Sequence, residues 1–419
     1  MVKVLIIADD FTGALDTGIQ FAKYGIETQI ITDWKLLRAS ISDTAEVVVV
    51  DSETRALSSE KAYEIVKSIT GEAVSLHAAT IFKKTDSALR GNVGAEFQAV
   101  LDGTNENQIY FIPAFPDINR ITKMGTHYIG GELLENSVFG RDPFEPVKIS
   151  FIPELLAKQC ACRIEVVKRT DQLPRRIDTE KTIYVFDAEY KEDIEERTNE
   201  LKRSNQLKLL AGCAGFAEFL PKALELEMGT ADHVKKSKGL YVACGSLSPI
   251  TKKQVEYMEL RGGVRVNLTP EQKVNKEYYK SEKGILFLEQ LSDLCKRNPF
   301  IIVDTFDLED KAATVEYAEK YGISKDEIRY CVSECHGKII KALLEKGMNY
   351  TIMLTGGDTL MGVMKILEGA HLNPVCEIER GVVVSKLDWR EKELQIITKS
   401  GGFGYEHTIF NIANEIFES

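Results

Sequence analysis

The first apolar run of the chain ends at two carboxylates and leads into a helical pattern. Residues 4–8 are all apolar, Asp9 and Asp10 come next, and a Thr-Gly turn signal lies at 12–13. The apolar positions that follow recur at helical spacing: Leu15, Ile19 and Ala22. This pattern predicts a strand, a tight turn and an amphipathic helix that Gly25 ends.

Strand-like runs alternate with helical patterns along the rest of the chain. In the first half they lie at residues 28–32, 46–50, 80–82, 108–112 and 182–186. In the second half they lie at residues 239–244, 264–268, 299–304, 350–354 and 393–398. The alternation predicts an α/β fold in which mainly parallel sheets are flanked by helices.

Two domains are expected from the length of 419 residues. The chain is short of large apolar residues between the two halves, which predicts a linker at residues 229–238. The linker would join an N-terminal domain of residues 1–228 to a C-terminal domain of residues 239–419.

Composition narrows the classes of function. Hydrophobic residues make up 44% and charged residues 28% of the chain, as in ordinary globular proteins. The net charge of −11 argues against nucleic-acid binding. No apolar run is long enough to predict a membrane span, and no signal-peptide pattern opens the chain, so we expect a cytoplasmic protein with reduced cysteines.

Asp9 and Asp10 lie where ligands of open parallel sheets bind, beyond the carboxyl end of a strand. Their side chains point to opposite faces, so the two need not share a role. One of them would accept the proton of a substrate hydroxyl group while the other caps the following helix. The alternative is that both only satisfy helix-start donors.

Charged side chains also follow two later strands. Arg55 follows the predicted strand at residues 46–50, and either binds a ligand carboxylate or pairs with a local acidic residue. The segment after the predicted strand at residues 80–82 is denser in polar groups and contains Lys84, Thr85, Asp86, Ser87 and Arg90. Such a cluster would be costly to bury without a partner, and a small hydroxy acid fits it; the alternative is a solvated loop.

The segment 113–150 is rich in turn formers and polar groups, which is typical of a loop that closes over a site. Its candidates for substrate contact are Arg120, His127 and Asp142.

Three glycine-rich turns follow predicted strands of the second half. They are Gly245-Ser246-Leu247-Ser248-Pro249, Thr355-Gly356-Gly357-Asp358-Thr359 and Lys399-Ser400-Gly401-Gly402-Phe403-Gly404. Turns of this kind bring backbone N–H groups close to phosphate, so three of them in one domain predict a nucleotide site. Asp358 is a candidate magnesium ligand, acting through water. Neither a Walker A motif nor a dinucleotide fingerprint occurs.

Taken together, the motifs at residues 8–14, 84–92, 113–150, 245–249, 355–359 and 399–404 resemble the four-carbon acid sugar kinase family. The resemblance covers nearly the whole chain. It implies an ATP-dependent kinase that phosphorylates the terminal hydroxyl group of threonate, erythronate or 3-oxo-tetronate. It further implies a sugar-acid-binding domain and a nucleotide-binding domain with the active-site cleft between them, and magnesium as an accompanying ion.

Site residues are carried over by the same resemblance. Those carried over to the sugar acid are Asp9, Asp10, Arg55, Lys84, Asp86, Ser87 and Arg90, and we expect Asp9 or Asp10 to be the catalytic base. Those carried over to ATP are Ser246, Gly356, Gly357, Asp358, Thr359, Gly401 and Gly402. From the segments described above we also expect Thr85 and His127 at the sugar acid and Ser400 at ATP.

The chain departs from the family pattern at two places. Asn119 replaces a glycine before Arg120, and Arg380 replaces a proline before Gly381. Asparagine tolerates the left-handed conformation, so the first change is expected to be mild, whereas the second leaves the geometry of its turn open. Two alternatives also stay open: a kinase of another small polyhydroxy acid, and a non-catalytic two-lobed sugar-acid-binding protein. The oligomeric state is open as well, with a homodimer among the options.

Overall fold

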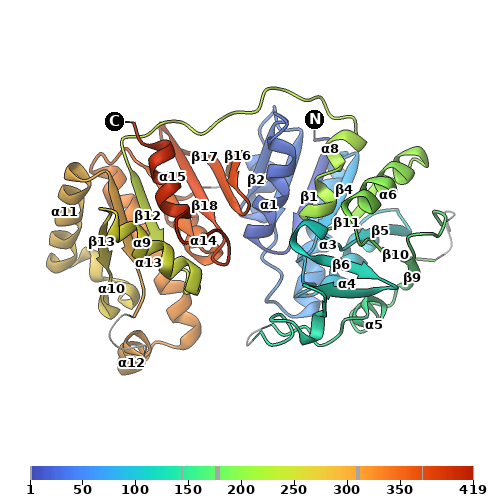
Figure 1. The fold of residues 1–419 in the computed structure, drawn as a ribbon, viewed down its shortest axis with the longest axis horizontal. Helices are drawn as coiled ribbons and strands as arrows, with labels where there is room; N and C mark the ends of the chain where they lie inside the picture. Colours follow the sequence, from blue (N-terminus) through green and yellow to red (C-terminus); the bar gives the residue numbers. More distant parts are fainter. Residues whose placement is uncertain (1, 143–144, 175–179, 308–311, 370, 419) are drawn as a thin grey trace. The chain divides into compact units, whose positions relative to one another are not determined.

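The computed structural model describes residues 2–142, 145–174, 180–307, 312–369 and 371–418 of the chain (Figure 1). The chain folds into two compact units, Met1–Ala231 and Asp232–Ser419. The boundary falls inside the segment 229–238 that the sequence marks as a linker. Both units combine a sheet with flanking helices, so the predicted α/β class is confirmed.

The main sheet of the first unit is parallel between all neighbouring strands. In spatial order its strands are β2 (Thr28–Ile31), β3 (Val47–Asp51), β1 (Val4–Ala8), β4 (Thr80–Lys84), β11 (Leu209–Gly212), β5 (Gln108–Ile112), β10 (Thr182–Phe186) and β9 (Arg163–Val167). The sequence did not predict β9 or β11. β9 is an edge strand with charged residues, and β11 is only four residues long and ends in glycine.

β1 lies in the middle of the sheet, between β3 and β4. The register places Ile6 beside Val49 on one side and Phe82 on the other. Such central strands are buried on both faces, which explains their continuous apolar sequence. At the carboxyl edge Ala8 is level with Asp51 and Lys84, so the segments that follow all three strands start side by side.

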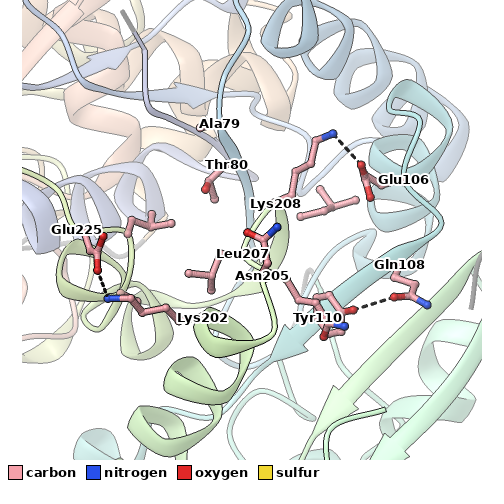
Figure 2. A pocket seen from close by; sticks show the side chains of 14 residues that line it. Ala79, Thr80, Glu106, Gln108, Tyr110, Lys202, Asn205, Leu207, Lys208 and Glu225 are labelled. Carbon is pink, nitrogen blue, oxygen red and sulfur yellow. Dashed lines mark hydrogen bonds and ion pairs between the residues drawn. The ribbon is translucent and has the colours of Figure 1, made fainter. Parts of the chain in front are cut away.

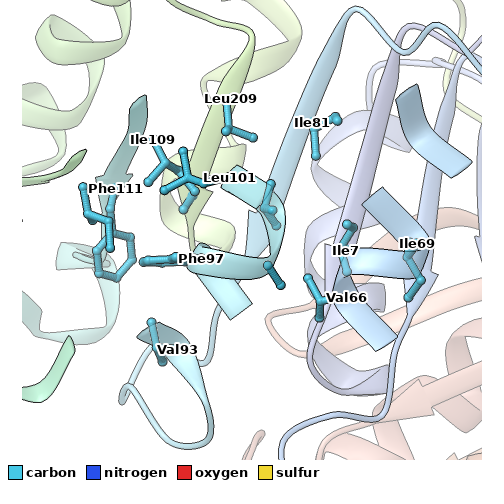
Figure 3. Packing of buried hydrophobic residues seen from close by; sticks show 14 of the residues in the cluster. Ile7, Val66, Ile69, Ile81, Val93, Phe97, Leu101, Ile109, Phe111 and Leu209 are labelled. Atoms are coloured by element: carbon cyan, nitrogen blue, oxygen red, sulfur yellow. The ribbon is translucent and has the colours of Figure 1, made fainter. Parts of the chain in front are cut away.

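Helices of the first unit follow most of its strands. They are α1 (Phe11–Ala22), α2 (Leu37–Ser40), α3 (Ser59–Ser75), α4 (Val93–Gly103), α5 (Ile152–Ala157), α6 (Lys191–Arg203), α7 (Ala214–Ala217) and α8 (Leu220–Ala223), with 3₁₀ turns η1 (Trp34–Leu36), η2 (Pro116–Ile118) and η3 (Leu134–Asn136). The core on one face of the sheet joins α3 and α4 to the strands (Figure 3). In it Phe97 of α4 meets Phe111 of β5 edge to face at 4.8 Å.

The segment predicted to be a long loop contains a small antiparallel sheet instead. Its strands are β6 (Arg120–Lys123), β7 (Thr126–Ile129) and β8 (Glu132–Leu133). The tight turns between them use left-handed residues, among them Gly125 with φ 72°. The prediction of an irregular loop was therefore wrong, because strands this short leave little periodicity to detect.

The sheet of the second unit is parallel over five strands and antiparallel over its last two. In spatial order its strands are β13 (Val264–Asn267), β14 (Phe300–Asp304), β12 (Leu240–Cys244), β15 (Thr351–Thr355), β18 (Lys392–Lys399), β17 (Val382–Trp389) and β16 (His371–Glu379). β16 and β17 were not predicted from the sequence. The other five strands match predicted runs within two residues at either end.

Helices again connect the parallel strands. They are α9 (Pro249–Leu260), α10 (Pro270–Val274), α11 (Glu282–Arg297), α12 (Ala313–Lys320), α13 (Lys325–Glu345), α14 (Gly357–Leu367) and α15 (Thr408–Ile416), with the 3₁₀ turn η4 (Tyr278–Lys280). A separate core forms around β12, β15 and β18 with α9 and α15. Among the described residues, no helix is both long and apolar enough to span a membrane.

Candidate functional site

The predicted sugar-acid residues gather at the carboxyl edge of the first sheet. Asp9 and Asp10 follow β1, Arg55 follows β3, and the segment from Lys84 to Arg90 follows β4. Because these three strands are neighbours and end at the same level, their following segments meet. The structure therefore brings together residues that are more than 70 positions apart in the sequence.

Asp10 is the N-cap of α1. Its Oδ1 accepts a hydrogen bond from the N–H group of Gly13 at 2.9 Å. The helix starts directly at Phe11, so the separate turn that we predicted at Thr12-Gly13 is absent. The cap satisfies one free helix-start donor and leaves the side chain of Asp10 24% exposed.

Arg55 pairs with protein carboxylates, which is the second of the two predicted alternatives. Its Nε donates to Asp9 Oδ2 at 2.7 Å, and its two Nη atoms contact the two oxygens of Asp10 at 2.7 Å. A third carboxylate, Asp86, lies 3.9 Å away. Burial alone would lower the pKa of Arg55, but these three carboxylates raise it well above its usual value. Arg55 is thus a fixed cation that orders the acidic residues around it.

Asp9 is more deeply buried than Asp10. Its side chain is 3% exposed, and its Oδ1 has no hydrogen-bond partner among the described residues. Burial raises the pKa of Asp9, but the charges of Arg55, Lys84 and Lys83 outweigh burial and hold the pKa below its ordinary value. Asp9 therefore stays ionised, and one of its oxygens accepts no hydrogen bond from the part of the chain that the structure describes.

Lys84 reaches the start of α1. Its Nζ donates to the carbonyl oxygen of Thr85 at 2.7 Å, and the residue is only 4% exposed. A Cβ atom on Gly13 would lie 2.6 Å from Lys84 Nζ and 2.6 Å from Asp10 Oδ1. The absence of a side chain at Gly13 is what allows the ammonium group to sit beside the helix N-terminus.

Asp86 and Arg90 form an ion pair across one turn of the chain. Arg90 Nε and Nη2 donate to the two carboxylate oxygens of Asp86 at 2.7 and 3.1 Å. Burial raises the pKa of Asp86, yet Arg55 and Arg90 together keep it far below its usual value. Asp142, which the sequence also proposed, lies 3.8 Å from Arg90.

His127 supports the segment after β4 from behind. The imidazole is fully buried; Thr122 Oγ1 lies 3.0 Å from Nδ1, and the carbonyl oxygen of Ser87 lies 3.0 Å from Nε2. Nε2 must donate to that carbonyl, and Nδ1 then accepts from the hydroxyl group. Burial lowers the pKa of His127 to about 4. The predicted substrate contact of His127 does not fit this position, because the ring has no free surface.

Two buried groups of the site were missed by the sequence reasoning. Lys83 points to the opposite side of β4 from Lys84, and its Nζ lies 2.9 Å from Glu96 Oε2 in the first turn of α4. Asp51 ends β3; burial, followed by Glu53 and Asp10, raises its pKa well above its usual value. Alternation along a strand separates the two lysines, but it does not show that Lys83 meets Glu96, which lies on a different element.

In the second unit the three glycine-rich turns contact one another. A Cβ atom on Gly245 would lie 2.2 Å from Thr359 Oγ1, and one on Gly401 would lie 2.3 Å from Ser246 Oγ. Gly356, with φ 90°, also packs against Ser246. The turns after β12, β15 and β18 thus form one surface at the carboxyl edge of the second sheet, and Ser246 is its centre. Helix α14 begins at Gly357, and apart from the adjacent residues no described atom lies within 4 Å of a Cβ on Gly402.

Lys399 is a further residue of this surface that was not selected from the sequence. Its Nζ donates to the carbonyl oxygen of Ser400 at 3.0 Å and to Thr251 Oγ1 at 3.3 Å. Burial lowers the pKa of Lys399 to about 8. Thr251 Oγ1 in turn donates to the carbonyl oxygen of Gly401 at 2.8 Å, so α9 and the third glycine-rich turn are tied together.

Asp358, the predicted magnesium ligand, pairs with an arginine. Its two oxygens accept from Arg329 Nε and Nη2 at 2.7 and 2.5 Å, and its side chain is 54% exposed. A magnesium ion near Asp358 would share this carboxylate with Arg329, so the role of Asp358 stays a prediction. Within the described part of the chain, no three His, Cys, Asp or Glu residues are grouped so that they could hold a metal ion.

The two departures from the family pattern have structural explanations. Asn119 adopts the left-handed conformation with φ 56°, as predicted for a residue that replaces glycine. Arg380 precedes Gly381, which has φ 73° in the turn between β16 and β17. The special conformation of this turn therefore falls on the retained glycine rather than on Arg380.

A separate hollow lies at the opposite, amino edge of the first sheet (Figure 2). It is bordered by the starts of β4, β5 and β11. Its charged side chains neutralise one another: Glu106 lies 2.8 Å from Lys208, and Lys202 lies 2.7 Å from Glu225. The chemistry of the first unit is therefore concentrated at the carboxyl edge and not in this hollow.

Family models match both units of the chain. Residues 4–220 match a family described as a sugar-binding N-terminal domain, and residues 241–409 match one described as a nucleotide-binding C-terminal domain. The first match contains the sugar-acid candidates, and the second contains all three glycine-rich turns.

Curated relatives extend over nearly the whole chain. A D-threonate kinase of Salmonella typhimurium is 27% identical over 97% of this chain and 96% of its own length. A D-threonate kinase of Bordetella bronchiseptica is 27% identical over 99% and 97%. A D-erythronate kinase of Heliobacterium modesticaldum is 25% identical over 62% and 61%.

Two solved structures share the fold. A Salmonella typhimurium protein described as a putative tRNA synthase matches with a TM-score of 0.80 at 19% identity, over 99% of this chain and 100% of the other. A Haemophilus influenzae protein matches with a TM-score of 0.75 at 21% identity, over the same shares of the two chains. At these identities the likeness concerns the fold alone.

Proposed function

Because the chain belongs to the four-carbon acid sugar kinase family, we propose that it transfers the γ-phosphoryl group of ATP to the terminal hydroxyl group of a four-carbon sugar acid. That it is a sugar-acid kinase follows from relatives that are kinases over nearly their full length. The non-catalytic alternative is disfavoured, since the second unit matches a nucleotide-binding family.

One observation supports the location of the sugar acid above all. Three adjacent strand ends place Asp9, Asp10, Arg55, Lys84 and Asp86 in one cluster with positive and negative groups interleaved. A polyhydroxy acid needs both signs: cations for its carboxylate and carboxylates for its hydroxyl groups.

We assign the orientation of the reacting hydroxyl group to Asp10. It is the more exposed carboxylate of the pair, and Arg55 and the N–H group of Gly13 fix its position. Asp9 is buried, and its contact with the Arg55 Nε atom makes it a positioning residue. Lys84 beside them would stabilise the negative charge that moves during phosphoryl transfer.

We assign ATP to the surface that the three glycine-rich turns form. The N-terminus of α14 and the open space over Gly402 suit a phosphate chain that approaches the backbone closely. Thr359 is 2% exposed and packs on Gly245, so its role is to position the turn. The magnesium requirement stays a prediction, and we expect the ion to bind together with ATP, coordinated by its phosphates. The cytoplasmic location also stays a prediction.

A screen of ATP consumption tests the proposal. The purified protein is mixed with ATP and, in turn, with each stereoisomer of threonate and erythronate and with 3-oxo-tetronate, and ADP release is followed. We expect one or two of these acids to support turnover at least about 100-fold above the others, because a site that pairs with each hydroxyl group discriminates strongly. ADP release with none of these acids, in the presence of magnesium, would contradict the proposal.

A further inference from the structure

The cations at the carboxyl edge of the first sheet differ in how they are neutralised. Arg55 contacts Asp9 and Asp10, and Lys83 contacts Glu96. Arg90 contacts Asp86 through two hydrogen bonds. Each of these charges already has a carboxylate within the protein, so binding a further carboxylate would require it to give up or share a partner.

Two cations at this edge differ from these. Lys84 Nζ donates to the carbonyl oxygen of Thr85 and has no described carboxylate within ion-pair distance. Arg120 has no described carboxylate within ion-pair distance either, and the one hydrogen bond of its guanidinium in the described structure runs from Nη1 to Ser87 Oγ. The residue is half-buried. Burial is the main reason that the pKa of Arg120 lies below its ordinary value. A desolvated guanidinium with unused donors is costly unless a ligand supplies the missing acceptors.

The surroundings hold Arg120 in place for such a ligand. It begins β6 directly after the left-handed Asn119, and its guanidinium lies 4.8 Å from the centre of the Phe139 ring. The same ring contacts Arg90 at 5.2 Å. One face of the guanidinium is thus covered by an aromatic ring, and Ser87 fixes one Nη atom.

We propose that Arg120 binds the carboxylate of the sugar acid and thereby selects acids over neutral polyols. This inference rests on the proposed function. Arg55 and Arg90 then act as positioning residues, which hold Asp10 and Asp86 for the hydroxyl groups. Lys84 lies beside Asp10 at the reacting end, whereas Arg120 lies beside Ser87. The substrate would extend from the hydroxyl end at Asp10 to the acid end at Arg120.

His127 is part of the same arrangement. Its Nε2 donates a hydrogen bond to the carbonyl oxygen of Ser87, and the hydroxyl group of Ser87 accepts one from Arg120 Nη1. Its Nδ1 contacts the hydroxyl group of Thr122, which lies on the same strand as Arg120. The β6–β7 pair therefore supplies both the guanidinium and the residue that fixes its neighbour.

The test compares two substrates that differ only in charge. The acid that turns over fastest in the ATP screen is measured against its carboxamide, which keeps every hydroxyl group. For Arg120→Gln we expect kcat/KM for the acid to fall about 100-fold, mainly through KM, while kcat/KM for the carboxamide changes less than about threefold. Arg120→Lys keeps the positive charge but loses the two-pronged guanidinium, so its kcat/KM for the acid should lie between the values of Arg120→Gln and the wild type.

Lys123→Gln is the matched control, because Lys123 lies on the same strand, carries the same charge and has a 58% exposed side chain. It should behave as wild type with both substrates. Calorimetric binding of the acid and thermal unfolding of each variant show whether a loss reflects binding or folding. Equal losses for acid and carboxamide, or an unchanged KM for the acid in folded Arg120→Gln, would overturn the assignment. A wild-type protein that is inactive with every acid would instead contradict the proposed function.

Discussion

Replacing Asp10 by asparagine separates catalysis from stability at the centre of the site. Asparagine caps a helix as well as aspartate does, so the contact with the N–H group of Gly13 is kept. The contacts to Arg55 lose their charge, but Arg55 still has Asp9 at 2.7 Å, and the Asp10 side chain is partly exposed. We therefore expect a loss of only about 1 kcal/mol in the free energy of unfolding. Removal of a carboxylate that orients the reacting hydroxyl group should lower kcat about 100- to 10,000-fold.

The Asp9→Asn variant is the matched comparison for Asp10→Asn. Asp9 is 3% exposed, and an amide in its place would bury unsatisfied N–H donors next to Lys83 and Lys84. We expect it to cost about 2 kcal/mol of stability, with a smaller effect on kcat than Asp10→Asn. Kinetics of ADP release and urea unfolding of both variants measure the two quantities. An Asp10→Asn enzyme with wild-type kcat would refute the assignment of Asp10, and wild-type rates in both variants would refute a catalytic role for the pair.

Three further predictions concern the surroundings of the two sites. Gly13→Ala should fold but lose at least about tenfold in kcat/KM, because its Cβ would lie 2.6 Å from both Lys84 Nζ and Asp10 Oδ1 and displace them; unchanged kinetics would contradict the role of these contacts. The affinity for ATP, measured by calorimetry from pH 7 to 9, should weaken as Lys399, with a pKa of about 8, loses its proton, and a flat profile would count against this. Between about pH 6.5 and pH 4 the free energy of unfolding should fall by about 1.4 kcal/mol per pH unit on account of His127, because its pKa is about 4 in the folded protein and 6.5 in the unfolded chain, which there binds a proton that the native state excludes. Urea unfolding at pH 7, 6 and 5 should show a shallower slope for His127→Gln, and an equal slope would contradict this.

Features that depend on neighbouring residues were predictable from the sequence. The apolar run before Asp9 and the strand at Gln108–Ile112 follow from local pattern alone, and so do the three glycine-rich turns. The parallel order then places successive strand ends at one edge, which is why the candidates of both units were found together in their own sheets.

Features that depend on distant partners were not predictable. Arg55 meets Asp9 across 46 positions, and Lys83 meets Glu96 on another element, so sequence spacing carries no signal for either pair. Asp358 pairs with Arg329, 29 positions earlier, and the sequence carried no sign of this ion pair. The hairpin that carries Arg120 escaped detection because its strands are only two to four residues long.

The position of the phosphoryl group in the product tests the central claim most directly. Wild-type enzyme, ATP and the active four-carbon acid are incubated to completion, and the product is examined by proton-coupled phosphorus NMR. Phosphorylation of the terminal hydroxyl group places two protons on the esterified carbon, so we predict that the new ester signal is a triplet. A doublet would show phosphorylation of an internal hydroxyl group, and the absence of any new ester signal would show that the acid is not phosphorylated at all; either result would contradict the account.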